Sequence, residues 1–393
     1  MKEETTEPKS DLKVEYVDTE EKLQQCVHYL RSVKELAFDL EFDRNKYTYG
    51  FNLCLVQVAT ADRCFIIDPL AKIQLDELFQ LFEDPSILKV VHSPGEDLRL
   101  LHSLKCYPKN IFDIQIAAKL LNHEKISLAN LIESATGIIS SKKQQTSNWG
   151  KRPLTEAQIL YSANDVIYLL QLKDVMLKEA KLKNIESFIE EEFRFLETTI
   201  HSSDPTDNFL KDSEIASLSD YHQFVLNELL KFRDGRAQRH NKPPAWIFPN
   251  DLIRDMAFGK VNLSSFFDWK GVYAGIKNQK FKDEFQKKWD GIMEEAAGMS
   301  KKSKAKFFGQ EERQRLREMK EENEKIRETK FKPIQAEIER QYGANTAKHM
   351  LGDGLVGRLL KREAKLSELK EEYRRQVILS AAAALNIDIS EYI

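Results

Sequence analysis

The 393-residue sequence contains few cysteines and no long apolar segment. Its cysteines are Cys26, Cys54, Cys64 and Cys106, and no two of them form a C-x-x-C pair. We therefore expect reduced core cysteines of a cytoplasmic protein, and no zinc site. No apolar run approaches the ~20 residues that span a bilayer, so no membrane span is expected. The N-terminal segment MKEETTEPKSDLK is polar and lacks the character of a signal or transit peptide.

An excess of charge of one sign is also missing. The formal net charge is −3 and the sequence pI is about 6.3. No global basic field therefore attracts this chain to nucleic acid, and any such binding must come from local patches and bound metal ions. The length predicts two to three domains, and the 41% hydrophobic content can bury cores of that size.

What the sequence does contain is a pair of acids inside an apolar segment. Residues 35–43, ELAFDLEFD, alternate with a period of two, which predicts a strand. Asp39 and Glu41 then lie on the same face, where they raise each other's pKa unless a cation lies between them. Magnesium takes hard oxygen ligands of this kind. The alternative interpretation is an edge strand with a solvated acidic face.

A second acidic position follows another predicted strand, the apolar run ILKVVHS. Asp97 comes two residues after Gly95, and the leucines after it predict a short helix. An acid at a helix start is normally a favourable interaction with the helix dipole, which is the alternative to a metal ligand. His92, at the end of the strand, is interpreted as structural.

The third acidic motif lies on a predicted helix. Thr155 and Gln158 form a T-x-x-Q capping box just after Pro153, so the helix is expected to begin near Thr155. Tyr161 and Asp165 are four residues apart and share one face, pointing away from an apolar stripe. The stripe, which would pack on a sheet, comprises Ile159, Ala163, Val166 and Leu170. The alternative is an ordinary solvent-exposed face.

The order of these motifs resembles that of a known family. D-x-E, then Asp, then Y-x-x-x-D is the arrangement of the DEDD 3′–5′ exonucleases of the tyrosine subtype. The stretches FDLEFDRNKYTYGFNLCLVQVAT and QTSNWGKRPLTEAQILYSANDVIYLL resemble the first and third motifs of ribonuclease D. The departures are small, since Leu40 stands where Thr is common and the second motif reads HSPGED. Neither departure removes a ligand.

The resemblance implies a two-metal mechanism, in which two cations stabilise the attacking and the leaving oxygen of an in-line displacement. The implied metal ligands are Asp39, Glu41, Asp97 and Asp165, holding two Mg²⁺ ions, with Mn²⁺ as an alternative. Asp39 would bridge the metals, Glu41 and Asp165 would complete the site of the nucleophilic water, and Asp97 would support the second metal. Tyr161 would be the fifth catalytic residue and orient the water, because a pKa near ~10 makes it a poor base at neutral pH. The expected product is a nucleoside 5′-monophosphate.

Basic and aromatic residues near the third motif are candidates for nucleic-acid contact. Trp149, Lys151 and Arg152 lie on a predicted loop just before the capping box. An indole and two cations beside a nuclease site suit base stacking and phosphate contact. The alternative is plain surface.

A second resemblance lies downstream, in SLSDYHQFVLNELLKFRDGRAQRHNKPPAWIFPNDLIRDMAF. This stretch begins with an amphipathic helix, which Pro243 and Pro244 must end. It resembles the helical HRDC module that follows the exonuclease domain in ribonuclease D. Arg236, Arg239 and Lys242 are its candidate contacts for nucleic acid, and a solvated helix face is the alternative.

The last part of the chain carries no family resemblance. Residues 301–330 contain eleven Lys/Arg and seven Asp/Glu, which indicates an exposed, charge-laced helix or a mobile linker. Residues 331–393 are richer in apolar side chains and predict two or three helices. Within them, GDGLVG (352–357) matches G-x-G-x-x-G, but no strand precedes it. A helix–turn–helix corner is therefore expected there, and no dinucleotide site.

The sequence thus predicts an α/β fold in three parts. A ribonuclease-H-like, mixed-sheet exonuclease domain at 12–200 leads through a linker near 201–214 to an all-α HRDC-like module at 215–298. A charged helical C-terminal extension follows at 301–393. The expected strands lie near 35–43, 53–60, 64–68 and 87–92, with a further short one near 111–114.

Three functions compete. The leading one is a monomeric, metal-dependent 3′–5′ exoribonuclease that trims RNA with a free 3′ end, tRNA precursors by family analogy. The second keeps the chemistry but acts on single-stranded DNA; the W-x-x-R-P-L segment and the HRDC-like module favour RNA. The third is a non-catalytic RNA-binding scaffold. Loss of a metal ligand would have supported the scaffold, but all four carboxylates and the tyrosine are present.

Overall fold

The computed structural model describes residues 12–139, 143–201, 208–302 and 310–393. The chain divides into two compact units. Of the described residues, the first comprises 12–41, 53–139, 143–201 and 313–393, and the second comprises 42–52, 208–302 and 310–312. Most of the polar N-terminal segment and much of the expected linker near 201–214 lie outside the described residues.

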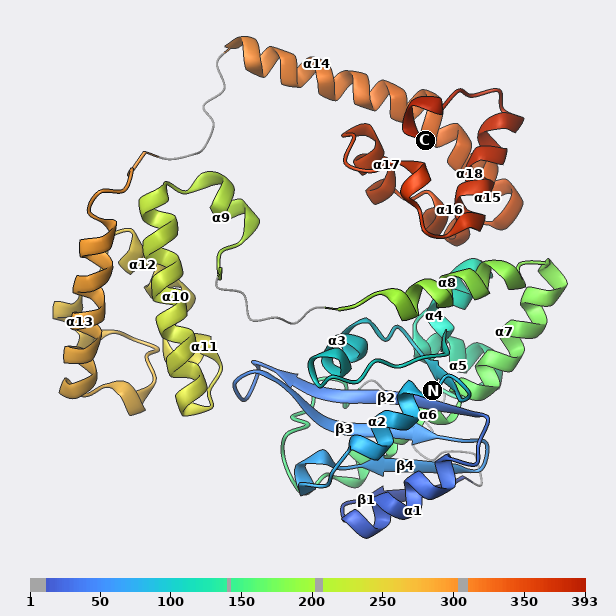
Figure 1. The fold of residues 1–393 in the computed structure, drawn as a ribbon, viewed down its shortest axis with the longest axis horizontal. Coiled ribbons are helices and arrows are strands. Elements are labelled where there is room, and N and C mark those ends of the chain that lie inside the picture. Colours follow the sequence, from blue (N-terminus) through green and yellow to red (C-terminus); the bar gives the residue numbers. More distant parts are fainter. Residues whose placement is uncertain (1–11, 140–142, 202–207, 303–309) are drawn as a thin grey trace. The chain divides into compact units, whose positions relative to one another are not determined.

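The first unit is built on a six-stranded mixed sheet (Figure 1). The strand order is β1-β4-β3-β2-β5-β6; β3 is antiparallel to β4, whereas β1–β4, β2–β5 and β5–β6 are parallel pairs. The strands are β1 (Lys13–Val17), β2 (Glu35–Arg44), β3 (Phe51–Ala59), β4 (Arg63–Ile67), β5 (Leu88–Val91) and β6 (Ile111–Asp113). The α/β class and the five predicted strands are confirmed. The sequence did not indicate β1, a five-residue edge strand that carries Lys13 and Glu15 and pairs with β4 alone.

Helices cover both faces of this sheet. On one face, Phe38 of β2 stacks on Phe82, with ring centroids 4.5 Å apart. Because successive side chains of a strand alternate, Asp39 and Glu41 point to the other face, where α6 packs on β4 and α7 on β5. The helices up to residue 201 are α1 (Glu20–Leu30), α2 (Asp76–Glu83), α3 (Gly95–Ser103), α4 (Ile114–Leu120), α5 (Leu128–Thr136), α6 (Glu156–Ile167), α7 (Leu169–Lys183) and α8 (Glu186–Thr198).

The capping box at the start of α6 is confirmed. Thr155 Oγ1 accepts a hydrogen bond from the Gln158 backbone N–H at 3.2 Å, and Gln158 Oε1 accepts one from the Thr155 N–H at 3.0 Å. Two N–H groups that would otherwise lack partners at the helix start are thereby satisfied. Ala163 and Val166, from the predicted apolar stripe, are fully buried.

The second unit is helical, as predicted, and has its own apolar core. Its long helix α10 ends at His240, followed by Asn241 in the left-handed conformation and then by the two prolines. The helices are α9 (Asp212–Ser217), α10 (Asp220–His240), α11 (Pro244–Ile247), α12 (Asn250–Ala257) and α13 (Gln279–Ala296). The resemblance to an HRDC module stays a prediction.

The C-terminal helices from α15 (Lys332–Tyr342) to α18 (Glu372–Ala384), labelled in Figure 1, belong to the first unit and share its apolar core. Thr346 is fully buried, and its hydroxyl donates to the backbone oxygens of Lys119 at 3.0 Å and Leu120 at 3.1 Å. Buried Glu192 of α8 accepts hydrogen bonds from His349 Nε2 at 2.7 Å and Tyr373 Oη at 2.5 Å. Residues from both ends of the unit thus form one core.

The C-terminal region contains more helices than the sequence predicted. The charge-laced segment forms the exposed helix α14 (Gln310–Ile326). Four helices follow in place of the two or three expected, because Gly343, with φ of 93°, separates the first two. They are α15 (Lys332–Tyr342), α16 (Ala344–Met350), α17 (Asp353–Leu360) and α18 (Glu372–Ala384). The G-x-G-x-x-G match lies at the corner between α16 and α17, as predicted.

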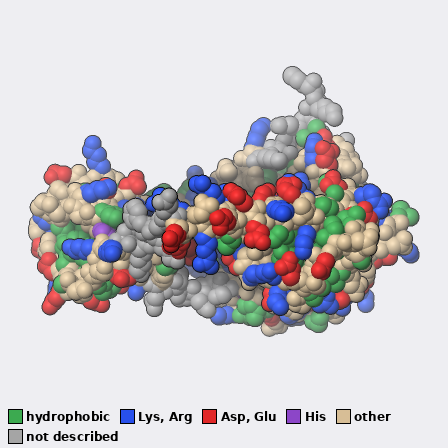
Figure 2. Space-filling view, turned by 90° about the horizontal axis from the view of Figure 1, so that it is seen from above, with side chains coloured by type: hydrophobic (Ala, Val, Ile, Leu, Met, Phe, Trp, Pro, Cys, Tyr) green, Lys and Arg blue, Asp and Glu red, His purple; other side chains and the backbone are tan. Residues whose placement is uncertain are grey.

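Surface and cysteine chemistry agree with the composition. On the face seen in Figure 2, acidic and basic side chains are interspersed. All four cysteines are buried and free of disulfides. None of the helices in the described ranges is both long and apolar enough to cross a membrane.

We predict that Thr155→Ala destabilises the first unit by about 1 kcal/mol, the usual cost of losing a helix cap. The thermal midpoint should fall by about 2–4 °C. Trp149 is the one tryptophan of this unit, since Trp246, Trp269 and Trp289 lie in the other, so its fluorescence reports on the first unit. Thr155→Ser keeps the hydroxyl and should behave like the parent; an equal loss in Thr155→Ser would contradict the capping role.

Candidate active site

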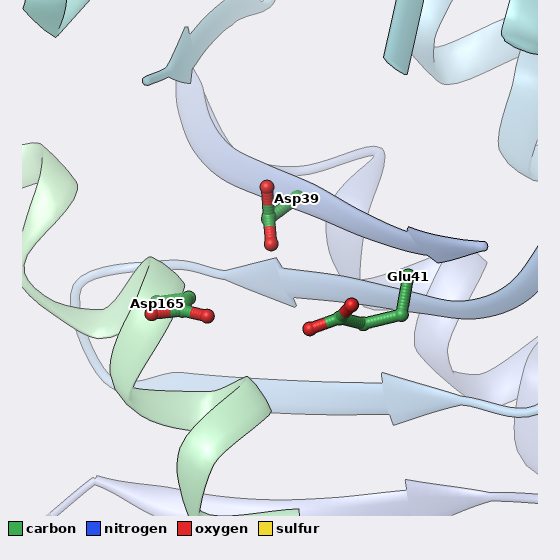
Figure 3. Close-up of side chains that lie close together, drawn as sticks. All are labelled: Asp39, Glu41 and Asp165. Atoms are coloured by element: carbon green, nitrogen blue, oxygen red, sulfur yellow. The ribbon is translucent and has the colours of Figure 1, made fainter. Parts of the chain in front are cut away.

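Three of the predicted metal ligands meet between β2 and α6 (Figure 3). Asp39, Glu41 and Asp165 each offer a carboxylate oxygen, and these oxygens lie within 4.8 Å of one another. The pair on β2 points toward the carboxylate on the helix. Residues about 125 positions apart in sequence therefore form one cluster of acidic oxygens.

Asp97 and Tyr161 lie beside this cluster. Asp97 is in the first turn of α3 and is outside the group of three, but its charge interacts with those of Asp39 and Glu41. Tyr161 is one helical turn before Asp165 on α6, and its pKa responds to the charges of Asp165, Glu41 and Asp39. The structure thus brings all five residues predicted as catalytic into one region.

In the described part of the chain, the cluster has no cationic side chain paired with it. Among the described residues, no Lys, Arg or His forms an ion pair with the three carboxylates. Burial, and then the neighbouring acids, raise the pKa of Asp39 well above its ordinary value and that of Glu41 to about 10. Burial also raises the pKa of Asp165 to about 7, against the opposing effect of the Tyr161 hydrogen bond. Close, part-buried carboxylates without a cationic side chain fit a site for divalent metal ions.

Tyr161 stays a neutral phenol in this environment. Burial is the main cause that raises its pKa above the ordinary value, and the charge of Asp165 adds to it. A neutral phenol can donate and accept hydrogen bonds but cannot serve as a general base.

A cavity of about 290 Å³ opens at the cluster and carries residues that the sequence did not single out. Its polar lining includes His92, Ser127 and Gln145 in addition to the predicted residues. Its apolar wall is formed by Leu128, Ala129, Ile132 and Leu169. Gln145 and Leu169 lie in the stretch that resembles the third motif, which was a signal for them, whereas Ser127, Leu128, Ala129 and Ile132 had none. His92 Nε2 also bonds to the Ile126 backbone oxygen at 2.9 Å, beside Ser127.

The residues expected to contact nucleic acid are only partly available. Trp149 is 4% exposed and packs in the core, and the guanidinium of Arg152 is paired with Asp68. Arg236 is paired with Glu284 and lies over the ring of Phe232. We therefore propose none of these three as a nucleic-acid contact. Lys151 and Arg239 are exposed and Lys242 is partly exposed, so their expected role stays a prediction.

The raised pKa values predict how stability depends on pH and metal. A carboxyl whose pKa is higher in the folded than in the unfolded chain stabilises the fold at low pH, and that contribution is lost as pH rises through the folded pKa. For Asp165 the stabilising contribution of the protonated carboxyl is lost as the pH rises through about 7. Mg²⁺ favours the ionised carboxylates, so it should raise the thermal midpoint by several degrees more at about pH 8 than at about pH 5.

The control is the double variant Asp39→Asn, Asp165→Asn, which should lose both the pH-dependent destabilisation and most of the response to Mg²⁺. A Mg²⁺ effect of equal size at both pH values, or one that survives in the double variant, would contradict the assignment.

The chain is similar to known proteins in sequence and in fold. Residues 14–181 match the family model described as a 3′-5′ exonuclease. The ribonuclease D of Gluconacetobacter diazotrophicus is 30% identical, over 67% of this chain and 68% of that protein. The ribonuclease D of Shewanella sp. (strain ANA-3) is 32% identical, over 63% of this chain and 61% of that protein.

A solved structure supports the fold of the whole chain. The Escherichia coli RNase D, titled an exoribonuclease involved in structured RNA processing, superimposes with a TM-score of 0.70 over 95% of this chain and 99% of that one. Its identity is 19%, so this likeness bears on the fold alone. The matches to the first curated ribonuclease D relatives span 61% and 66% of their length. On these similarities the chain belongs to the ribonuclease D family.

Proposed function

We propose that this protein is a metal-dependent 3′–5′ exoribonuclease that shortens RNA from a free 3′ end and releases nucleoside 5′-monophosphates. The observation that carries the proposal is the cluster of Asp39, Glu41 and Asp165, with their carboxylate oxygens within 4.8 Å and Tyr161 in the lining of the same cavity. Membership of the ribonuclease D family and the two relatives named ribonuclease D support RNA as the substrate. Trimming of tRNA precursors is proposed by family analogy.

The chemistry follows from the side chains present. Asp39, Glu41, Asp97 and Asp165 would hold two Mg²⁺ ions, which when bound stabilise the attacking and leaving oxygens of an in-line displacement. The phenol of Tyr161, which lines the cavity together with Asp165, would orient a water molecule through Oη. The cavity beside the cluster has polar and apolar walls, which suit a sugar and a base.

Other parts of the chain would assist this reaction. Lys151, Arg239 and Lys242 are proposed to contact phosphates, and the helical unit is proposed to act as an HRDC-like accessory module for RNA. We further propose a monomer that acts in the cytoplasm, a reducing compartment in which four free cysteines persist.

Asp39→Asn should lower cleavage to the level seen in EDTA, because the cluster loses the carboxylate that interacts with both Asp165 and Asp97. The measurement uses matched 5′-labelled RNA and DNA single strands with Mg²⁺ or with EDTA. A ladder that shortens from the 3′ end of RNA, absent in Asp39→Asn, supports the proposal. The exposed Asp174 provides the matched control, and Asp174→Asn should cleave like the parent.

Two results would move the assignment. Equal or faster loss of the DNA strand would make the protein a DNA-directed exonuclease. Binding of RNA without any metal-dependent shortening would leave a scaffold and refute the enzyme.

Tyr161→Phe should reduce kcat by about 10²–10⁴-fold, the usual cost of losing an oriented proton donor or acceptor. It should leave Mg²⁺ binding intact, because no metal ligand is removed. Tyr29 lies on α1 and hydrogen-bonds to Thr60 and Asp62. The control variant Tyr29→Phe should therefore have the kcat of the parent. An unchanged rate in Tyr161→Phe would make Tyr161 a packing residue.

A further inference from the structure

Each of the three guanidinium nitrogens of Arg152, in the segment W-x-x-R-P-L, donates a hydrogen bond to the protein. Nε and one terminal nitrogen donate to the two oxygens of Asp68, at 2.5 and 2.6 Å. The same terminal nitrogen donates to the backbone oxygen of Cys54 at 2.7 Å, and the other donates to that of Trp149 at 2.7 Å. This planar, two-pronged geometry is specific to arginine, since lysine offers a point charge without a fork.

Asp68 is a fixed anchor for that guanidinium. It lies directly after β4, is 4% exposed, and accepts further hydrogen bonds from Tyr16 Oη at 2.5 Å and the Leu70 N–H at 2.9 Å. Burial by itself would raise the pKa of Asp68, but the hydrogen bonds from Arg152 and Tyr16 outweigh it and hold that pKa below its ordinary value. The carboxylate is therefore ionised and tied to the sheet through β1, β3 and β4.

Trp149 connects this anchor to the active site. Its backbone oxygen is held by Arg152, and its buried indole packs against the ring of Tyr161, with centroids 6.0 Å apart and planes at 35°. Tyr161 lines the cavity together with Asp165, whereas neither Trp149 nor Arg152 is among the cavity-lining residues. A chain of direct contacts thus runs from the sheet through Arg152 and Trp149 to the phenol.

We infer that Arg152 is a positioning residue for Tyr161: through Trp149 it holds the phenol at the angle needed to orient the water at Asp165. The inference rests on the proposed function and adds to it a residue that touches neither substrate nor metal ligand. It also explains why a tryptophan and an arginine beside a nuclease site are turned inward, with no part in nucleic-acid contact.

The test is a double-mutant cycle of Arg152→Lys and Tyr161→Phe. Arg152→Lys keeps the charge at Asp68 but loses the fork that also holds Trp149, so kcat should fall by up to about 10²-fold, as for a misplacement of about 1 Å. KM should change little, because Arg152 does not line the cavity. In the Tyr161→Phe background the phenol oxygen is absent, so Arg152→Lys should cause no further loss. The inference would be overturned if Arg152→Lys lowered kcat by the same factor in both backgrounds. It would also be overturned if Arg152→Lys changed only KM or left kcat unchanged.

Lys173→Met provides the matched control for stability. Lys173 of α7 is a buried cation in the same unit, paired with Glu35 and Asp174, and its removal breaks a comparable ion pair. Lys173→Met should lower the thermal midpoint but should not cause the fall in kcat that is expected for Arg152→Lys. A kcat loss in Lys173→Met equal to that in Arg152→Lys would show general destabilisation and overturn the inference.

A fluorescence measurement tests the geometry without any substrate. The emission of Trp149 is obtained as the difference between the parent and Trp149→Phe. In Arg152→Lys this emission should shift to longer wavelength as the indole loses its buried position, and an unchanged emission would overturn the inference whatever the activity. If the parent cleaves neither RNA nor DNA, the proposed function fails, and the fluorescence still decides whether Arg152 holds Trp149.

If Arg152→Lys does not fold, Trp149→Phe replaces it in the cycle. The phenylalanine ring is smaller than the indole and contacts less of the Tyr161 ring. In Trp149→Phe, kcat should therefore again fall in the parent background but not in the Tyr161→Phe background. A Trp149→Phe protein with the kcat of the parent would overturn the inference.

Discussion

Like charges held close together are the constraint on which this structure depends. Asp39, Glu41 and Asp165 bring carboxylate oxygens within 4.8 Å in a part-buried site, and burial raises the pKa of each. Repulsion and desolvation both oppose this arrangement in the metal-free chain. The surrounding fold must therefore hold the acids in place through contacts that do not involve them.

Two rigid elements do this on either side of the cluster. On β2, Phe38 and Leu40, which alternate with the two acids along the strand, are buried, and Phe38 stacks on Phe82. On α6, the capping box defines the first turn, and burial of Ala163 and Val166 sets which face carries Tyr161 and Asp165. Arg152 and Trp149 add a third support just before that helix. The acids are thus placed by packing and hydrogen bonds of the residues beside them.

The C-terminal helices extend the same core over a long sequence distance. Thr346 hydrogen-bonds to the end of α4, and Glu192 of α8 accepts hydrogen bonds from His349 and Tyr373. Burial tends to raise the pKa of Glu192, but these hydrogen bonds outweigh it and keep that pKa below its ordinary value. Because an ionised, buried carboxylate is costly without partners, this contact makes the first unit depend on His349 and Tyr373 of its C-terminal helices.

The amino-acid sequence by itself determined the local features of this protein. The period of β2, the start of α6 and the shared face of Tyr161 and Asp165 follow from alternation, capping and helical spacing, which act over a few residues. The order of the acidic motifs indicated the family. Only the tertiary structure decided that Trp149 is buried, that Arg152 pairs with Asp68, and that residues 331–393 share the exonuclease core. An exposed and a buried tryptophan, or a free and a paired arginine, have the same local sequence pattern, because the partners that distinguish them lie tens to hundreds of positions away.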